Sequence, residues 1–376
     1  MEKAHSANGV RFFHAPPARS VGWGVKATAT GLGVDVKAIS YEETGPSSVL
    51  KLRDRPLPVP GPGEVRVRVV VSGVNPTDWK SRSGNGSKKL DAPKVPNQDG
   101  AGVIDALGPG VTGLSVGGRV WLWDVAWGSN EGTAQEYVVV PGNKAVPLPD
   151  TESFDTGASL GIPALTAHRA LTSNEDGPAR LSAGALAGRT VLVTGGAGAV
   201  GHAAIQLARW AGATVITTVS GDQKAELARR AGAGTIINYR TGDVVGAVHQ
   251  VAANGVDMIV DVNAPANITT DLDVIKPGGT ISIYAANPGE SLTVPIRESM
   301  ARNVRYQFIL TYTVTDEQKR QAVAAVGEAL AAGALRVGEE YGLPLTRFPL
   351  DQTPAAHDAV EQETVGKVLI DVAPAP

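Results

Sequence analysis

The sequence predicts a two-domain α/β protein, in which an all-β domain precedes a parallel sheet flanked by helices. Three observations lead to this fold class. The length of 376 residues suits two domains of ordinary size. Short β-rich segments bounded by Gly or Pro fill the first part of the chain, and strand-like and helix-like segments alternate after about Leu160.

Composition excludes several classes of protein. With 37 acidic and 34 basic side chains the net charge is −3, which argues against a nucleic acid or an anionic membrane surface as partner. The absence of cysteine excludes disulfides, catalytic thiols, iron–sulfur clusters and cysteine-liganded zinc. No apolar run reaches the roughly 18 residues that a membrane helix needs. We therefore expect a cytoplasmic globular protein that acts on a small molecule.

Residues 1–35 have no sustained hydrophobic period and lack the apolar core, about 7–15 residues long, of a secretory signal. We expect a disordered leader outside the fold or a mis-assigned start of the chain, with a transit-like address as the alternative.

The first domain, residues 36–160, contains strands that alternate charged and apolar residues or that lie between Gly and Pro turns. The expected strands are residues 36–41, 64–71, 100–106, 119–123 and 134–140. This spacing of short strands is typical of an all-β, barrel-like domain.

The second domain, residues 161–312, alternates strands with helices, as in βαβ units around a parallel sheet. The expected strands are residues 189–194, 214–219, 235–238, 258–262 and 280–284, with helices over 200–211 and 223–231. In the tail, residues 313–376, a helix over 317–332 and a closing strand over 367–372 are expected to complete the first domain.

A glycine-rich turn follows directly after the strand 189–194 and opens a helix. Gly196, Gly198 and Gly201 satisfy the pattern G-x-G-x-x-G. We expect Gly196 to allow the tight turn, Gly198 to leave room for a pyrophosphate, and Gly201 to let helix and strand approach closely. The helix N-terminus then presents N–H groups to phosphates, so the segment predicts a dinucleotide site.

The end of the next strand decides which dinucleotide binds. An enzyme that uses NAD places Asp or Glu there, whereas this strand ends at the uncharged Ser220 and is followed by Lys224. Lys224 can pair with a 2′-phosphate; the alternative is that Lys224 is only a solvated charge on the helix surface. We expect Asp222 to be the N-cap of the helix rather than the missing acid. These residues favour NADPH.

Ordered motifs along residues 36–372 resemble the medium-chain dehydrogenase/reductase superfamily, specifically its zinc-free quinone oxidoreductase branch, the zeta-crystallin-like proteins. The motifs are residues 73–78 (GVNPTD), 98–104 (QDGAGVI), 108–111 (GPGV), 117–120 (GGRV), 165–167 (LTA), 195–201 (GGAGAVG), 238–240 (NYR), 276–279 (KPGG) and 366–369 (GKVL). The resemblance implies a GroES-like β-barrel catalytic domain and a Rossmann domain with a doubly wound parallel sheet.

The same resemblance implies that no metal is bound. The zinc alcohol dehydrogenases of the superfamily carry a Cys, a His-Glu pair and a second Cys at their ligand positions. The corresponding places here are Asn75, Gln98 with Asp99, and Ile162. Isoleucine offers no ligand atom, and amides are poor zinc ligands beside thiolate or imidazole.

The resemblance also implies further contacts to the coenzyme. Ala197, Gly198, Ala199 and Val200 would line the pyrophosphate, and Ser220, Lys224 and Tyr239 would surround the phosphate of the adenosine, unless Tyr239 only fills a strand end. The residues that would flank the nicotinamide are Asn263, Tyr284, Ala285, Phe308 and Leu310.

Without a metal, the substrate must be easy to reduce, as quinones and conjugated enones are, and the protein mainly positions it against the nicotinamide. Where the family often carries a Tyr near the nicotinamide, this chain has Lys80. Its ammonium would stabilise negative charge on the substrate, although a surface lysine is the alternative. Asn75 would donate its amide similarly, unless it is a structural turn residue before Pro76.

Aromatic residues from separate segments are expected to meet between the domains and suit a planar acceptor. The expected pocket residues are Trp79, Trp121, Trp123, Trp127 and Tyr312, with Tyr284 nearby. Tryptophans in the core of the barrel are the alternative.

The function we expect is NADPH-dependent, metal-independent reduction of a quinone by hydride transfer. An NADPH-dependent reductase of enones, alkenals or 2-enoyl thioesters is the second possibility, and a crystallin-like protein that binds NADPH without turnover is the third. The resemblance also implies a homodimer.

Overall fold

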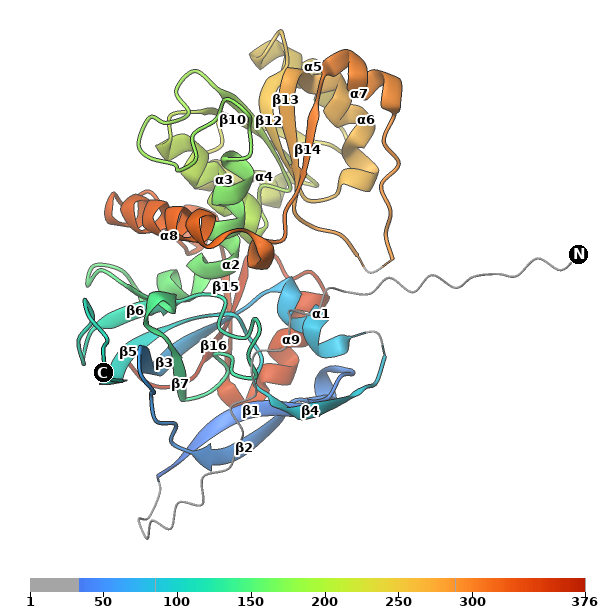
Figure 1. The fold of residues 1–376 in the computed structure, drawn as a ribbon. Coiled ribbons are helices and arrows are strands. Elements are labelled where there is room, and N and C mark those ends of the chain that lie inside the picture. The colour runs from blue at the N-terminus through green and yellow to red at the C-terminus, as the bar shows by residue number, and fades with distance from the viewer. Residues whose placement is uncertain (1–33, 85, 288, 376) are drawn as a thin grey trace, which may run out of the picture.

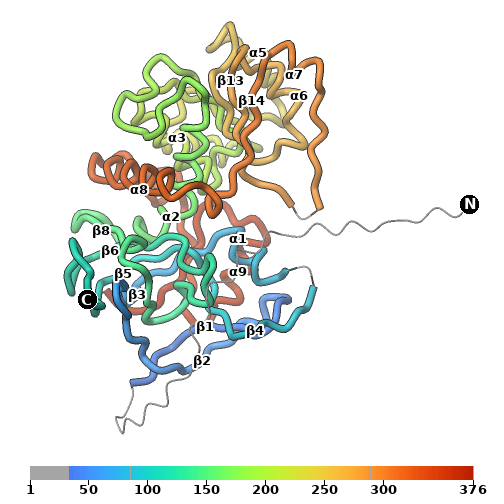
Figure 2. The backbone as a smooth tube through the Cα atoms, viewed as in Figure 1, coloured from blue at the N-terminus to red at the C-terminus, as the bar shows by residue number. Residues whose placement is uncertain are grey.

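The computed structural model describes residues 34–84, 86–287 and 289–375, which fold into two bodies joined by long helices (Figure 1). The start of the chain, from blue to cyan, forms the lower body together with the C-terminal segment in red, and the middle of the chain forms the upper body (Figure 2). The expected leader lies outside the described residues except for its last two, and the first strand already begins at Asp35.

A seven-stranded sheet organises the lower body, with strand order β15-β16-β3-β5-β6-β8 and β7 paired to β3. Its strands are β3 (Glu64–Val74), β5 (Asp99–Leu107), β6 (Arg119–Leu122), β7 (Tyr137–Pro141), β8 (Ala145–Pro147), β15 (Leu345–Pro349) and β16 (Lys367–Asp371). In β3, Val65, Val67 and Val69 are fully buried while the arginines between them reach the surface, because alternate side chains point to opposite faces.

The C-terminal strand returns to the sheet formed by the first part of the chain. β16 pairs antiparallel with β3, with Val368 opposite Val74 and Leu369 opposite Gly73. The lower body also holds a three-stranded sheet of order β2-β1-β4, made of β1 (Asp35–Glu43), β2 (Lys51–Pro56) and β4 (Lys89–Lys94). Two helices, α1 (Pro76–Ser83) and α9 (Thr353–Glu361), pack against each other beside these sheets.

The upper body is a six-stranded sheet of order β11-β10-β9-β12-β13-β14 in which every neighbouring pair is parallel. Its strands are β9 (Thr190–Thr194), β10 (Thr214–Val219), β11 (Thr235–Asn238), β12 (Val256–Asp261), β13 (Ile275–Ile283) and β14 (Arg305–Phe308), and its helices are α3 (Ala199–Trp210), α4 (Asp222–Ala231), α5 (Val244–Val251), α6 (Ala264–Val274) and α7 (Ile296–Arg302). The strand order reverses between β9 and β12. Ligands of such sheets bind at the carboxyl ends of the strands beside this reversal.

Two helices lie between the bodies. α2 (Phe154–Leu171) packs against β5, β6 and α3, and α8 (Asp316–Ala331) packs on α2 (Figure 1). The sequence did not reveal α2, because most of this helix is buried on all sides and it carries Pro163 in its interior. A helix that is apolar all round has no amphipathic stripe to recognise.

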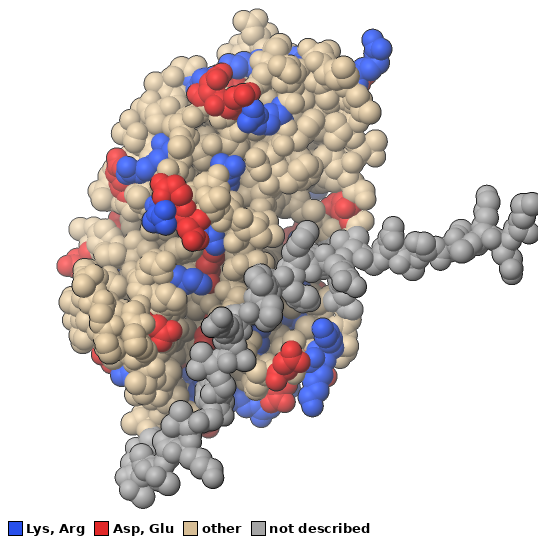
Figure 3. All heavy atoms as spheres, viewed as in Figure 1, with Lys and Arg blue, Asp and Glu red and all other residues tan. Residues whose placement is uncertain are grey.

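Charged groups of both signs are interspersed over the face seen in Figure 3. Among the described residues, no helix has both the length and the apolar character required to cross a membrane.

Candidate active site

The glycine turn between β9 and α3 is shaped by close packing on one side and open space on the other. Gly195 has the left-handed backbone (φ +69°), so it, rather than the expected Gly196, provides the conformational freedom of the turn. A Cβ at Gly196 would lie 2.1 Å from Thr217 Oγ1, and one at Gly201 would lie 2.4 Å from the Gly195 carbonyl oxygen. Both positions therefore require glycine for packing.

Gly198 differs from these glycines because its Cβ would meet no atom closer than the Gly195 carbonyl oxygen at 3.5 Å. It is the N-cap of α3 and has no side chain to cap the helix. Ala199 and Val200 form the first turn, and Ala197 is buried beside it. The N–H groups of this turn and the open space at Gly198 fit a pyrophosphate, because a helix N-terminus attracts anions.

At the end of β10, the chain passes through Ser220 and Gly221 into α4. The structure corrects the expectation that Asp222 caps this helix: Gly221 is the N-cap, and Asp222 is the first helical residue. Lys224 lies in the same turn, half-buried, and Tyr239 follows the neighbouring strand β11 with 52% of its surface exposed. The fold therefore brings Ser220, Lys224 and Tyr239 to the carboxyl ends of adjacent strands.

The five residues expected around a nicotinamide lie at or just after the ends of β12, β13 and β14, on the other side of the strand reversal. Asn263 is the N-cap of α6, and its backbone N–H donates to Asp261 Oδ1 at 2.6 Å. The Tyr284 N–H donates to the Asp261 carbonyl oxygen, and Ala285 comes next in the chain. Phe308 and Leu310 are 62% and 51% exposed, so their side chains remain free to contact a ligand.

The positions that correspond to the zinc ligands of related enzymes are hydrogen-bonded to one another. Asn75 Nδ2 donates to Asp99 Oδ2 at 2.7 Å, and the Ile162 N–H donates to Asp99 Oδ1 at 2.9 Å. Lys367 of β16 donates to Asn75 Oδ1 at 2.6 Å, and its Nζ lies 3.6 Å from Asp99 Oδ2. The side chains of Lys367 and Asp99 are 1% and 0% exposed. A lysine ammonium is thus enclosed among the polar groups.

This donor set does not fit zinc. Ile162 contributes no ligand atom, Asn75 and Asp99 already bind each other, and the ammonium of Lys367 would repel a divalent cation. Within residues 34–84, 86–287 and 289–375, no group of three or more His, Cys, Asp or Glu side chains is arranged to hold a metal ion.

Burial controls the ionisation of the groups around Asn75. Desolvation raises the pKa of Asp99 and lowers that of Lys367, although each partly offsets the shift of the other. Asp78 accepts the Asn75 N–H at 2.7 Å in the capping box of α1, and burial together with the charge of Asp99 raises its pKa to about 7. Asn75 is itself 2% exposed, and both ends of its side-chain amide are hydrogen-bonded, so it acts first as a structural residue.

Lys80 crosses the junction between the two bodies. It belongs to α1 of the lower body, and its Nζ donates to the Ala286 carbonyl oxygen at 2.9 Å, just beyond Tyr284 and Ala285 in the upper body. Burial lowers the pKa of this ammonium. The expected Lys80 is therefore brought beside the segment that follows β13.

Two of the expected aromatic residues meet across the same junction. The rings of Trp127 and Tyr312 are stacked, with centroids 4.4 Å apart and planes at 15°. Tyr312 Oη donates to Thr77 Oγ1 of α1 at 3.1 Å. Burial and the nearby charge of Asp78 raise the pKa of Tyr312, so its hydroxyl stays protonated. We call Trp127 and Tyr312 the aromatic wall.

The remaining tryptophans have different positions. Trp79 is half-buried on α1, with Lys80 Nζ 5.7 Å from its ring centroid. Trp121 is fully buried in the core under α2, and Trp123 is 6% exposed. The full burial of Trp121 corrects the expectation that its ring lines an acceptor pocket. Trp123 is as buried as Tyr312, which is 7% exposed, and its place in the pocket stays a prediction.

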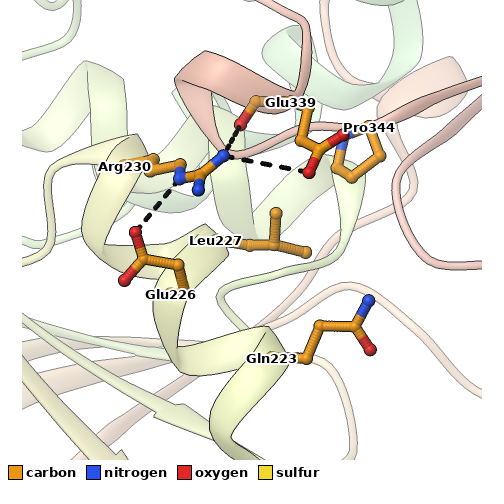
Figure 4. A pocket seen from close by; sticks show the side chains of 6 residues that line it. All are labelled: Gln223, Glu226, Leu227, Arg230, Glu339 and Pro344. Carbon is orange, nitrogen blue, oxygen red and sulfur yellow. Dashed lines mark hydrogen bonds and ion pairs between the residues drawn. The ribbon is translucent and has the colours of Figure 1, made fainter.

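A surface hollow lies along α4, from the first turn of this helix to Arg230. It has a volume of about 350 Å³ and is bordered by Gln223, Leu227 and Pro344 (Figure 4). Arg230 spans it, bonded to Glu226 Oε1 at 3.1 Å and to the Glu339 carbonyl oxygen at 3.1 Å (Figure 4). None of the residues expected to bind coenzyme or acceptor borders this hollow.

Sequence reasoning missed four residues that organise the site. Lys367 and Asp124 are buried charges and Lys319 is a mostly buried one. Their partners lie far away in the chain, and Ala286 contributes only a carbonyl oxygen. What distinguishes these charged residues is their burial, and burial can be recognised only in the folded structure.

Comparisons with known proteins agree with this architecture. Residues 61–150 match the family model described as alcohol dehydrogenase GroES-like domain, and residues 199–328 match the one described as zinc-binding dehydrogenase. The second description does not extend to the donor set around Asn75, which does not fit zinc.

Curated relatives include quinone oxidoreductases from Rattus norvegicus and Homo sapiens, each 30% identical. The rat protein aligns with 89% of this chain and 97% of its own length, and the human protein with 86% and 94%. A mycobacterial protein solved in complex with NADPH is 30% identical and superposes with a TM-score of 0.73 over 89% of this chain and 99% of its own.

These matches cover both domains, and the fold has a GroES-like domain beside a Rossmann domain. The chain belongs to the quinone oxidoreductase family of the medium-chain dehydrogenases/reductases and is an NADPH-dependent oxidoreductase.

Proposed function

We propose that the protein reduces quinones with NADPH by hydride transfer and without a metal ion. The observation that carries the proposal is the aromatic wall, because two stacked rings at the domain junction suit a planar acceptor. The names of the curated relatives support the same substrate class.

The coenzyme fits the residues at the strand ends. The pyrophosphate would bind at the N-terminus of α3, where Gly198 leaves open space, and the 2′-phosphate would pair with Lys224 near Ser220 and Tyr239. When bound, NADPH supplies the hydride. Asn263, Tyr284, Ala285, Phe308 and Leu310 would enclose the nicotinamide and exclude water from it.

On the acceptor side, Lys80 is the group we assign to the chemistry. Its ammonium is held beside Ala286 and would stabilise the negative charge that develops on the acceptor oxygen. Because burial lowers its pKa, Lys80 is also a stronger acid than an exposed lysine and can give that oxygen a proton. Asn75 would support this role indirectly by fixing the start of α1.

A spectrophotometric assay tests the proposal. NADPH oxidation is followed with 9,10-phenanthrenequinone, 1,4-benzoquinone, an alkenal and crotonyl-CoA, with and without a chelator. We expect turnover with the quinones that is unchanged by the chelator. Turnover with crotonyl-CoA alone, or activity that needs an added divalent ion, would contradict the proposal.

A second candidate is the reduction of a conjugated alkene. A relative named 2-haloacrylate reductase from a Burkholderia species is 28% identical over 79% of this chain and 87% of its own length. The alkenal in the same assay identifies this activity. If the protein binds NADPH but no acceptor oxidises it, only the crystallin-like role, binding of NADPH without turnover, would remain.

We also propose that two copies associate through β14. This strand is the last in the order of the six-stranded sheet, and Ile296 and Met300 of the neighbouring α7 are 73% and 74% exposed. A second copy would continue the sheet and cover these apolar side chains. Sedimentation velocity is expected to show a dimer, which Met300→Asp weakens. A monomer at all concentrations would contradict this.

We also propose that the protein acts in the cytoplasm, where it would use the soluble coenzyme NADPH. Fractionation of cells that express the full chain would test it, and recovery in a membrane or organelle fraction would contradict it.

A further inference from the structure

The ammonium of Lys319 connects three segments that are distant in the sequence. Lys319 lies in the first turns of α8, and its Nζ donates to Asp124 Oδ2 at 2.8 Å and to the Tyr312 carbonyl oxygen at 2.9 Å. It also lies 5.7 Å from the ring centroid of Trp123. The side chain is 14% exposed, so water competes little for these contacts.

Asp124 is the buried partner that makes this contact specific. Its side chain is 1% exposed, and its backbone has the left-handed conformation (φ +53°), which is uncommon outside glycine. Its carbonyl oxygen accepts from Lys144 Nζ at 2.5 Å and from the Trp127 N–H at 3.4 Å. Asp124 therefore fixes the loop that carries Trp127.

The two anchors of Lys319 thus hold both members of the aromatic wall. One is the carbonyl oxygen of Tyr312 itself, and the other is the side chain of Asp124, whose main chain holds Trp127. Trp127 comes from the lower body, whereas Tyr312 follows the last strand of the upper body. Without the ammonium, the Tyr312 carbonyl oxygen and the Asp124 carboxylate would both lose this donor. The ring contact, the bond from Tyr312 Oη to Thr77 and the Lys144 bond to the Asp124 carbonyl oxygen would remain.

We propose that Lys319 is a positioning residue that fixes the aromatic wall and thereby sets the preference of the enzyme for large planar acceptors. This inference rests on the proposed function. A large planar acceptor depends on the position and spacing of both rings, while a small quinone can bind in several orientations. Displacement of a positioning group by about 1 Å is enough to slow the reaction of such a substrate markedly.

The test compares the acceptor preference of variants. The double variant Lys319→Met with Asp124→Asn removes the ammonium without leaving a buried carboxylate unpaired. We expect the KM for 9,10-phenanthrenequinone to rise about tenfold, while the KM values for 1,4-benzoquinone and NADPH change less than about twofold. Arg320→Met is the matched control, because Arg320 is on the same helix and pairs with Glu317 at the surface.

A milder variant, Lys319→Gln, keeps one hydrogen-bond donor and is expected to give an intermediate KM, and it provides the answer if the double variant does not fold. Trp127→Leu should produce the same change in preference, and adding it to Lys319→Gln should produce little more. An equal fall in kcat for both quinones with unchanged KM values would overturn the inference, because it would show a purely structural role.

The two proposals fail in different ways. If the wild-type protein oxidises NADPH with neither quinone, the proposed function itself is wrong. If the wild type reduces both quinones and the Lys319 variants keep its preference between them, only the role of Lys319 is wrong.

Discussion

The coenzyme side and the acceptor side of this site differ in how the chain builds them. The coenzyme side centres on residues 195–201, a continuous turn in which Gly201 packs against Gly195 and Gly196 packs against Thr217 of the adjacent strand β10. The acceptor side brings together α1, the loop after β6, the segment after β14 and the start of α8. The first is a local structure, and the second exists only when the two bodies are in contact.

This difference separates two kinds of sensitivity. A change in the glycine turn acts through one steric contact and affects every reaction that uses the coenzyme. A change on the acceptor side acts through contacts between distant segments and should alter preference between substrates more than total activity.

The largest effect is expected at Gly198. Valine there suits the extended backbone (φ −82°, ψ 161°), and its Cβ would meet no protein atom closer than 3.5 Å, but the side chain fills the space assigned to the pyrophosphate. We expect Gly198→Val to lower kcat/KM for NADPH on the order of 10²-fold with an unchanged Tm. Gly201→Ala should instead lower the Tm, since its Cβ would lie 2.4 Å from the Gly195 carbonyl oxygen. Calorimetry and kinetics together separate the two cases, and a large loss of Tm in Gly198→Val would contradict the assignment.

A smaller effect is expected at Lys224. Lys224→Ala should raise the KM for NADPH about tenfold and leave that for NADH nearly unchanged, because only NADPH carries the 2′-phosphate. Arg229→Ala is the matched control, since Arg229 is a surface cation at the other end of α4. Equal changes with both coenzymes would show that the phosphate binds elsewhere.

At the domain junction, Lys80→Met should reduce kcat for 1,4-benzoquinone about fivefold at unchanged KM for NADPH. Methionine keeps the length of the side chain but removes the ammonium that reaches Ala286. Lys88→Met, at an exposed lysine beyond the end of α1, is the control. Unchanged kcat would identify Lys80 as a structural contact only.

The smallest effect concerns stability and pH. The folded protein holds the Asp78 proton with a pKa of about 7, against 3.8 for the free side chain. The folded state therefore binds more protons between these values, and the contribution of Asp78 to stability is lost as the pH rises towards 7. Deprotonation of Asp78 as the pH rises can lower the unfolding free energy by up to about 1.4 kcal/mol per pH unit.

Asp78→Asn should remove this component, so the difference between the two proteins in chemical denaturation should change between pH 4 and pH 7. Asp150→Asn is the control, because Asp150 is 96% exposed. Parallel pH profiles for wild type and Asp78→Asn would contradict the shifted pKa.

Much of the fold was predictable because its signals are local. The strands at 214–219 and 235–238 were predicted with the bounds that the structure has, and α3 and α8 were predicted within one residue. The prediction was incomplete where burial erases periodicity, as in α2, and it was wrong about Trp121 and about the N-cap of α4.

The sequence by itself determined the glycine turn, the alternation of strands and helices after residue 189, and the absence of cysteine chemistry, since each depends on neighbouring residues or on composition. Only the tertiary structure decided which charges are buried together. Lys367 meets Asp99, and Lys319 meets Asp124 and Tyr312, through contacts between distant segments. A buried ion pair is stable only if both partners are desolvated and aligned, and a linear pattern of residues contains no information on that geometry.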